Sequence, residues 1–297
     1  MSPTNVTARR QEPPVGRREH QALRLMTWNL WWRFGDWRRR GDAIAEILAD
    51  EQPDICGLQE VWAEPAGRHQ LDELADRLGY HWVWAPRANP RRWQRRVDDD
   101  SSSCLIGNAV MSRWPLGEPT VVPIADAEPS EGPHLLVVDV DTPWGPLTVA
   151  TTHLTSALGG SRLRCTQVGD IVRHLSTRPP TPWPLVLTGD LNAYPDSDEV
   201  RLLEGHRTAP VVDDFVLVDA WRYAEPGDLG FSWDRTNPYV AVTGEPSARC
   251  DYVLLTPPTT GHGNVLHSRL GRTNSDGVWA SDHAPVVVDL AISGADQ

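Results

Sequence analysis

The sequence of 297 residues contains no lysine, and cysteine, methionine and phenylalanine are scarce. Apart from histidine, every basic side chain is therefore an arginine, and the formal net charge is −12 at pH 7. A protein that binds nucleic acid tightly and without sequence preference normally presents a strongly basic face, so this composition argues against such a binder. It does not exclude a nuclease, because a bound metal ion supplies local positive charge in an acidic site.

The four cysteines lack the close paired spacing of a zinc site or a redox motif; they are Cys56, Cys104, Cys165 and Cys250. Cys56 and Cys250 lie inside strand-like runs, where a free cysteine commonly serves as a small buried apolar residue. This usage predicts a reduced protein with a cytoplasmic location.

Long apolar runs are also missing, since none approaches the roughly 20 residues needed to span a bilayer. Residues 1–22 are polar and contain no apolar segment of the secretion-signal type. We therefore expect disordered tails at residues 1–22 and 292–297 and a single domain over residues 23–291. We expect a monomer without a transmembrane segment.

Apolar residues make up 40% of the chain, which is enough for a sizeable core. Helical spacing predicts helices at residues 37–50, 67–78 and 161–175. Alternating or continuous apolar runs predict strands at residues 23–29, 55–59, 80–85, 103–111, 134–141, 147–153, 185–188, 252–255 and 286–290. Helices and strands interleave without a low-complexity linker, so the predicted fold class is α/β, with two packed sheets and flanking helices in one domain.

Oxygen-bearing side chains stand next to several of these strands. Glu60 follows the strand at residues 55–59, Asp282 precedes the last strand, and Asn29 ends the first. Mg2+ prefers oxygen ligands and usually takes only one or two protein carboxylates, so these residues suit magnesium, with Mn2+ as the alternative. Taken alone, Glu60 is more typical of a surface acid that follows a strand.

A second group of polar residues suits the chemistry of a phosphate ester. In the sequence Gly189–Asn192, Asp190 is placed to orient or deprotonate an attacking water, and Asn192 to donate to a phosphoryl oxygen. The alternative is an Asx turn, for which these residue types are ordinary.

His283 follows Asp282, and Asp251 offers a second acid. A carboxylate bonded to one imidazole nitrogen fixes the tautomer and favours the cation, which stabilises charge in the transition state. His153, at the end of a predicted strand, is a candidate second donor to the phosphate. For His283 the alternative is a histidine that only satisfies hydrogen bonds at a strand start.

The sequence does not decide the role of two segments. The arginine-rich stretch from residue 87 to 100 is either a solvated surface loop or a loop whose arginines engage phosphate. Residues 28–37 contain tryptophan and phenylalanine side chains that either pack in the core or form the exposed wedges of a lipid phosphodiesterase. Arg33 and Arg38–Arg40 could join the arginine loop in the positive rim of a nuclease.

In order along the chain, these motifs resemble the endonuclease/exonuclease/phosphatase superfamily, the magnesium-dependent phosphoesterases of pancreatic-deoxyribonuclease type. The resemblance runs from about Leu23 to Leu290 and is carried by Thr27–Asn29, Leu58–Glu60, Gly107–Arg113, Thr152–Leu154, Gly189–Asn192, Asp251–Leu254 and Ser281–His283. It implies a four-layer α/β sandwich with two mixed central sheets and an active site at one sheet edge.

The resemblance also implies roles for single residues. Glu60 binds the metal together with Asn29 and Asp282, and His153 contacts the scissile phosphate. The remaining residues position water and phosphate or pair as acid and base; they are Asp190, Asn192, Asp251 and His283. Related deoxyribonucleases give the histidine of the Thr-His-Leu motif an acidic partner, for which residues 98–100 are the candidates here.

The function predicted from the sequence is magnesium-dependent hydrolysis of a phosphoester in a nucleic acid, a phospholipid or a small metabolite. Two alternatives stay open: a catalytically idle family member that acts as a binding or scaffold module, and a specialised biosynthetic enzyme on the same scaffold. The segment from Phe231 to Pro238 borders the substrate, unless Trp233 serves only in packing.

Overall fold

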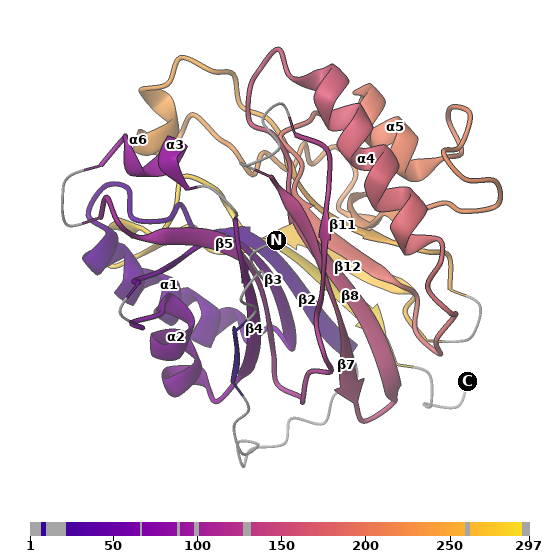
Figure 1. The fold of residues 1–297 in the computed structure, drawn as a ribbon, viewed down its shortest axis with the longest axis horizontal. Coiled ribbons are helices and arrows are strands. Elements are labelled where there is room, and N and C mark those ends of the chain that lie inside the picture. Colours follow the sequence, from indigo (N-terminus) through magenta and orange to yellow (C-terminus); the bar gives the residue numbers. More distant parts are fainter. Residues whose placement is uncertain are drawn as a thin grey trace.

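The computed structural model describes residues 7–9, 22–65, 67–87, 90–97, 101–126, 132–258 and 262–292. In these residues the chain forms four layers, with helices on the outside and two sheets packed face to face in the middle (Figure 1). This arrangement confirms the predicted α/β sandwich. No helix in the described ranges is long and apolar enough to cross a membrane.

The first sheet mixes parallel and antiparallel pairs. Its strands are β1 (Thr7–Arg9), β2 (Ala22–Asn29), β3 (Ile55–Ala63), β4 (His81–Pro86), β5 (Leu105–Ser112), β12 (Val265–Leu270) and β15 (Val286–Ala291). Their spatial order is β1-β4-β5-β3-β2-β15-β12, and only β2 and β3 pair in parallel. The helices α1 (Trp37–Glu51) and α2 (Gln70–Leu78) lie on its outer side (Figure 1).

The second sheet has the spatial order β10-β11-β9-β8-β7-β6 and one parallel pair, β8 with β9. Its strands are β6 (Thr120–Pro123), β7 (His134–Thr142), β8 (Gly145–His153), β9 (Val186–Asp190), β10 (Val218–Asp219) and β11 (Asp251–Leu255). The helices α4 (Ser161–Leu175) and α5 (Asp198–Glu204) cover its outer side (Figure 1). The short elements are α3 (Arg91–Gln94), the 3-10 helix η1 (Ala220–Tyr223), α6 (Pro238–Ala241), β13 (Asn274–Ser275) and β14 (Val278–Trp279).

Strand periodicity explains the layers. Successive side chains of a strand point to opposite faces, so a strand buried on both sides reads as a continuous apolar run. In β2, Leu23 and Leu25 pack between the sheets, while Met26 and Trp28 pack against α1 and α2. Each such side chain stabilises the fold by about 1.5–3 kcal/mol when fully buried.

Polar contacts join the two sheets just below the edge where the predicted site residues end their strands. Gln59 Nε2 donates to Thr151 Oγ1 at 2.9 Å and to Thr27 Oγ1 at 3.2 Å. Beside them, a Cβ on Gly57 would lie only 1.9 Å from Thr188 Oγ1, so the sheets approach too closely here for any side chain. This close contact holds the ends of β2, β3, β8 and β9 together at one edge.

The structure differs from the predicted N-terminal tail. Within residues 1–22, Thr7–Arg9 form β1, which pairs antiparallel with residues 82–84 of β4. A sheet edge offers unpaired backbone groups that recruit an extended segment, and composition alone does not reveal such a partner. Residues 1–6, 10–21 and 293–297 of the predicted tails lie outside the described residues.

Candidate active site

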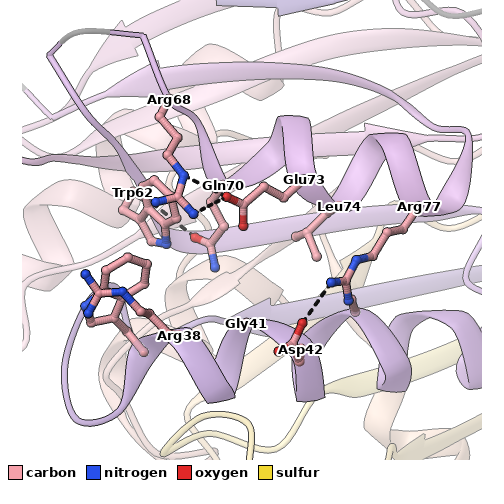
Figure 2. A pocket seen from close by; sticks show the side chains of 11 residues that line it. Arg38, Gly41, Asp42, Trp62, Arg68, Gln70, Glu73, Leu74 and Arg77 are labelled. Carbon is pink, nitrogen blue, oxygen red and sulfur yellow. Dashed lines mark hydrogen bonds and ion pairs between the residues drawn. The ribbon is translucent and has the colours of Figure 1, made fainter.

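Two of the hollows in the described surface combine charged and aromatic side chains with a volume of several hundred Å³. The first, which we call the α1–α2 groove, has a volume of about 360 Å³ and lies between α1 and α2 (Figure 2). Arg77 pairs with Asp42 at 2.8 Å and Arg68 with Glu73 at 2.6 Å, and these four side chains are about half exposed or more. None of the predicted site residues lines this groove.

The second hollow, which we call the edge cleft, has a volume of about 450 Å³. Seven of the eight predicted site residues line it: Asn29, Glu60, His153, Asp190, Asn192, Asp282 and His283. The eighth, Asp251, is fully buried behind His283. The structure therefore brings together side chains that are up to 254 positions apart in the sequence, from Asn29 to His283.

Glu60 does not follow a strand end, as predicted, but lies inside β3. The pairing of β3 with β5 shifts register between Leu58 and Val61, and Glu60 has a φ of +53° at this irregularity. A positive φ is unfavourable for glutamate, and such strain occurs at sites where a bulge redirects a side chain. The bulge turns the carboxylate into the edge cleft.

The two oxygens of Glu60 have different environments. Oε1 accepts a hydrogen bond from Trp93 Nε1 at 3.0 Å, whereas Oε2 is buried without a hydrogen-bond partner. Burial raises the pKa of Glu60, because the charged form loses its hydration. An unpartnered carboxylate oxygen facing a cleft is suited to bind a cation.

Asp190 ends β9 at the centre of the edge cleft. Asn29 Nδ2 donates to its Oδ2 and the Asn192 backbone N–H to its Oδ1, each at 3.0 Å. His153 lies opposite Asp190 in the β8–β9 pairing, and Asp251 lies opposite it in the β9–β11 pairing. Sheet register therefore places these three residues in one row.

The backbone of Gly189–Asn192 combines a strand end with a turn. Gly189 lies within β9, where a Cβ would lie 2.4 Å from the Thr152 carbonyl oxygen, so close strand contact requires glycine. The turn comes at Asn192, whose φ is +48°. The bond from Asn192 N–H to the Asp190 carboxylate makes an Asx-type turn, so the turn and the cleft position occur together.

His283 forms a short contact with Asp251, 2.7 Å between Nδ1 and Oδ2. Burial by itself lowers the pKa of His283, but the nearby carboxylates, Asp251 first and then Asp190 and Asp282, raise it well above the usual value. The imidazole is therefore cationic near neutral pH, with Nε2 directed to the Asp190 carboxylate at 3.7 Å.

His153 is held in the opposite state. Burial lowers the pKa of His153 to about 4, so its ring is neutral near neutral pH. Its Nε2 lies 3.5 Å from Asp190 Oδ2 and its Nδ1 lies 4.0 Å from Glu60 Oε1. The candidate acidic partners at residues 98–100 lie outside the described residues.

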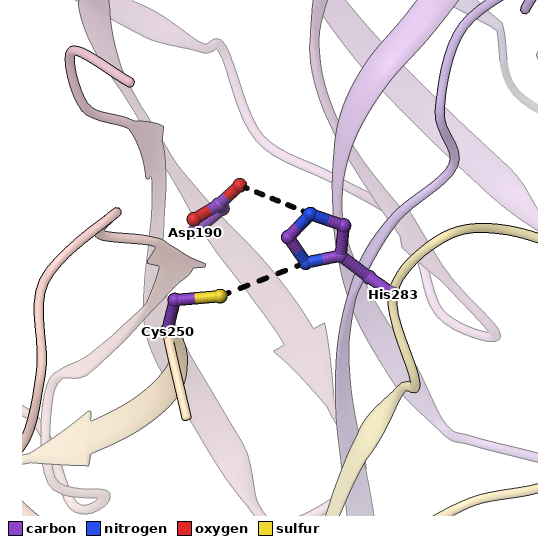
Figure 3. Close-up of side chains that lie close together, drawn as sticks. All are labelled: Asp190, Cys250 and His283. Atoms are coloured by element: carbon purple, nitrogen blue, oxygen red, sulfur yellow. Dashed lines mark hydrogen bonds and ion pairs between the residues drawn. The ribbon is translucent and has the colours of Figure 1, made fainter. Parts of the chain in front are cut away.

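Cys250 contacts the same network, which the sequence did not indicate. Its Sγ lies 3.8 Å from His283 Nδ1 and 3.5 Å from Asp251 Oδ2. Asp190, Cys250 and His283 form a compact group of the kind that binds metal ions (Figure 3). However, Asp190 and Cys250 approach different ring nitrogens, and burial raises the pKa of the thiol, whereas metals bind the thiolate. We interpret this group as part of a hydrogen-bond network.

Asn29, Glu60 and Asp282 fit a divalent cation better. Burial raises the pKa of Asp282 to about 7, and the negative charges of Glu60 and Asp190 add to this shift. Asn29 Oδ1 accepts one bond, from the Trp31 N–H, which leaves it a second lone pair. Buried carboxylates that raise one another's pKa bind a cation favourably, and all three residues offer the oxygen ligands that magnesium prefers.

Residues 26–283 match the model of the Endonuclease/Exonuclease/phosphatase family. The chain belongs to this family. Membership supports a phosphoester-hydrolysing enzyme of nuclease or phosphatase type, in a family that is generally dependent on divalent metals.

Solved structures of similar fold include an endonuclease/exonuclease/phosphatase from Beutenbergia cavernae, which is 26% identical, with a TM-score of 0.66 and coverage of 93% of this chain and 73% of that one. TDP2 from D. rerio in complex with a single-strand DNA product is 19% identical, with a TM-score of 0.71 and coverage of 92% and 100%. The human Nocturnin catalytic domain is 18% identical, with a TM-score of 0.64 and coverage of 97% of both chains. A 57-residue stretch, 19% of this chain and 16% of the relative, is 46% identical to Protein angel of Drosophila melanogaster.

In this family member, Arg40 is a structural residue and not part of a positive rim. Its buried guanidinium donates to five backbone carbonyls, those of Leu30, Trp31, Trp32, Phe34 and Ala280. Arg33 is also buried, with its guanidinium 4.1 Å from the ring centres of both Trp37 and Trp62. Both arginines fix the segment that follows β2, so of the four arginines expected from this segment Arg38 and Arg39 are exposed. In the arginine-rich loop, Arg92 and Arg96 are exposed as well.

The walls of the edge cleft combine arginine and aromatic side chains. Trp31, Phe34, Arg92 and Arg96 line it, and Tyr194, which is 44% exposed, lines it as well. Trp28 and Trp32 are fully buried, so much of the aromatic segment packs in the core.

Trp233 both lines the edge cleft and packs, since its ring meets the His283 ring edge-on at 5.0 Å. Packing and a place on the cleft wall therefore occur together in this residue. The contact places an apolar surface directly beside the imidazole.

Proposed function

We propose that this protein is a divalent-metal-dependent phosphodiesterase that acts in the edge cleft, with Mg2+ as the metal and Mn2+ as the alternative. The observation that carries the proposal is the gathering of Glu60, Asp190 and Asp282 in one cleft, where Glu60 Oε2 has no hydrogen-bond partner. Asn29, Glu60 and Asp282 would hold the cation. When bound, it would supply positive charge that stabilises the negative charge developing on the phosphate.

In this proposal Asp190 orients the attacking water and accepts its proton. Its carboxylate is suited to this role because Asn29 and Asn192 donate to its two oxygens and fix its plane. Asn192 also has a side-chain amide, which donates to the Leu154 carbonyl at 3.1 Å in the absence of substrate. We assign this amide to a phosphoryl oxygen when substrate binds.

The two histidines have different roles in the proposal. His283 is cationic and fixed by Asp251, so it donates from Nε2 to the phosphate and stabilises charge in the transition state. His153 is neutral and donates an N–H to the same phosphate. Neighbouring groups whose environments drive their pKa values apart are typical of sites that divide such tasks.

A nucleic acid is the substrate class that we propose first. The fold neighbour from D. rerio was solved with a single-strand DNA product, and single strands bind to grooves that combine positive charge with aromatic stacking surfaces. Arg92, Arg96, Trp31 and Tyr194 offer both features on the walls of the edge cleft. The complete burial of Trp28 and Trp32 argues against their use as membrane wedges.

A substrate panel tests this function. Plasmid DNA, single-stranded DNA, RNA, sphingomyelin and a set of nucleotides are incubated with Mg2+ or with EDTA. We expect cleavage of nucleic acid that EDTA abolishes and that Asp190→Asn reduces by at least 10²-fold, as for the loss of a group that acts on the transition state. Hydrolysis that survives EDTA, or near-normal turnover by the folded variant, would contradict the proposal.

A further inference from the structure

Trp93 makes a contact with the proposed metal site that no sequence motif indicates. It lies in α3, within the arginine-rich segment between β4 and β5, and its side chain is only 5% exposed. The ring packs in a cluster with Trp32, Trp62 and Ile106. Its position is thus set by the core and not by a chance surface contact.

The indole N–H donates to Oε1 of Glu60 at 3.0 Å. With Oε1 occupied, the carboxylate plane is fixed and Oε2 is the oxygen left without a hydrogen-bond partner. The donor is neutral, unlike an arginine or lysine, so it orients the carboxylate without cancelling its charge. A carboxylate held in this way keeps its full attraction for a cation.

The neighbouring arginines take different positions. The guanidinium of Arg96 lies 4.4 Å from the centre of the Phe34 ring, and Arg92 donates to Ser156 Oγ at 2.9 Å. Although both arginines line the edge cleft, the Glu60 carboxylate accepts its hydrogen bond from the uncharged indole of Trp93. The segment therefore presents its charges to the cleft and its neutral donor to Glu60.

We propose that Trp93 is a positioning residue, which holds Oε1 of Glu60 so that Oε2 points to the divalent cation. The inference rests on the proposed function, since it assigns Glu60 to the metal. Partners that orient metal ligands typically contribute 10- to 100-fold to metal affinity. Trp93 also anchors α3, which carries Arg92, so loss of Trp93 should also raise the KM of a polyanionic substrate. This increase in KM should be smaller than the loss of metal affinity, because the indole contacts Glu60 directly.

Isothermal titration of the purified full chain with Mn2+ and Mg2+ tests the proposal directly. We expect Trp93→Phe to weaken the Kd for the metal by about 10- to 100-fold. Trp62→Phe is the matched control, because Trp62 is buried in the same aromatic cluster but is not hydrogen-bonded to Glu60. This control should bind metal like the wild type, and thermal unfolding of both variants reports any general loss of packing.

A second variant separates the hydrogen bond from the packing. Trp93→His retains a ring N–H and should bind metal more tightly than Trp93→Phe. Equal metal affinity of the wild type and Trp93→Phe, or an equal loss in Trp93→Phe and Trp62→Phe, would overturn the positioning role. Failure of the wild type itself to bind either metal would instead overturn the proposed function, so the two failures are distinguishable.

Discussion

The edge cleft and the α1–α2 groove have similar volumes, about 450 and 360 Å³, and both are lined by tryptophan, arginine and acidic side chains. They differ in the burial and the ion pairing of their acidic side chains. In the groove, Asp42 and Glu73 are exposed and paired with arginines. In the cleft, Glu60 and Asp282 are buried, and the basic side chains within 4.0 Å of their carboxylates, among the described residues, are the imidazoles of His153 and His283.

Volume therefore does not distinguish the proposed active site from a surface hollow. An exposed ion pair contributes only about 0.2–1 kcal/mol and is screened by salt, so the groove is close to electrostatic balance. Buried carboxylates without a matching cation oppose folding, because burial of their charge costs free energy. A ligand that supplies the missing positive charge offsets this cost. The comparison can be tested by making the same substitution in both hollows.

The largest effect is expected for the glutamates. Glu60→Gln should reduce phosphodiester cleavage by at least 10³-fold, because it removes a charged metal ligand from the proposed site. Glu73→Gln makes the same chemical change in the α1–α2 groove and should leave kcat/KM unchanged. Steady-state cleavage of a labelled oligonucleotide measures both variants. A similar loss of cleavage activity in both variants would contradict the proposed difference between the two hollows.

The second-largest effect is expected for Asp251, the partner of His283. Asp251→Asn should lower kcat by about 10²–10³-fold, because the imidazole loses the carboxylate that fixes and charges it. Asp42→Asn is the matched change in the groove and should have no effect on kcat. Rates measured under saturating Mg2+ keep metal affinity out of the comparison. Full activity of folded Asp251→Asn would show that the Asp251–His283 pair has only a structural role.

Metal binding should also raise the thermal stability of the protein. A ligand that binds only the folded state stabilises it by about 2.7 kcal/mol at 100 times its Kd. We expect Mg2+ or Mn2+ to raise the unfolding temperature of the wild type and of Glu73→Gln by the same amount. Glu60→Gln should lose most of this increase. The measurement is a thermal melt across a metal titration, and a metal effect retained in Glu60→Gln would exclude Glu60 as a ligand.

The smallest effect is expected for the paired ions of the groove. Asp42→Asn breaks the exposed contact with Arg77, so the free energy of unfolding should fall by no more than about 1 kcal/mol. Urea denaturation in low and high salt measures this term, which should shrink as the salt concentration rises. A larger loss that salt does not reduce would mean that the groove carries buried charge after all.

Much of the fold could be predicted from local patterns. The helix expected at residues 161–175 agrees with α4, and the helix expected at 37–50 agrees with α1 to within one residue. The hairpin strands begin or end at His134 and His153, as expected. These features depend on the periodicity of apolar residues over a few turns or strand repeats, which the sequence displays directly.

The details of the site were harder to predict from the sequence. The bulge at Glu60 depends on the pairing of β3 with β5, and the contact of Cys250 with His283 joins residues that are 33 positions apart. Trp93 lies in the stretch of residues 87–100, for which the sequence predicts a loop, yet its indole reaches Glu60 from α3. Such contacts arise from packing between distant segments and leave no periodic signal.

The sequence alone is enough to name the acids, amides and imidazoles that share one edge of the sandwich, although Glu60 lies inside β3 and not at its end. Strand periodicity is local, so this information is present in short motifs. The state of these groups is set by folding: which oxygen of Glu60 lacks a partner, which histidine is cationic, and which arginines are buried. Those properties depend on solvent exclusion and on charges brought within a few ångströms by folding, and no short stretch of chain contains them.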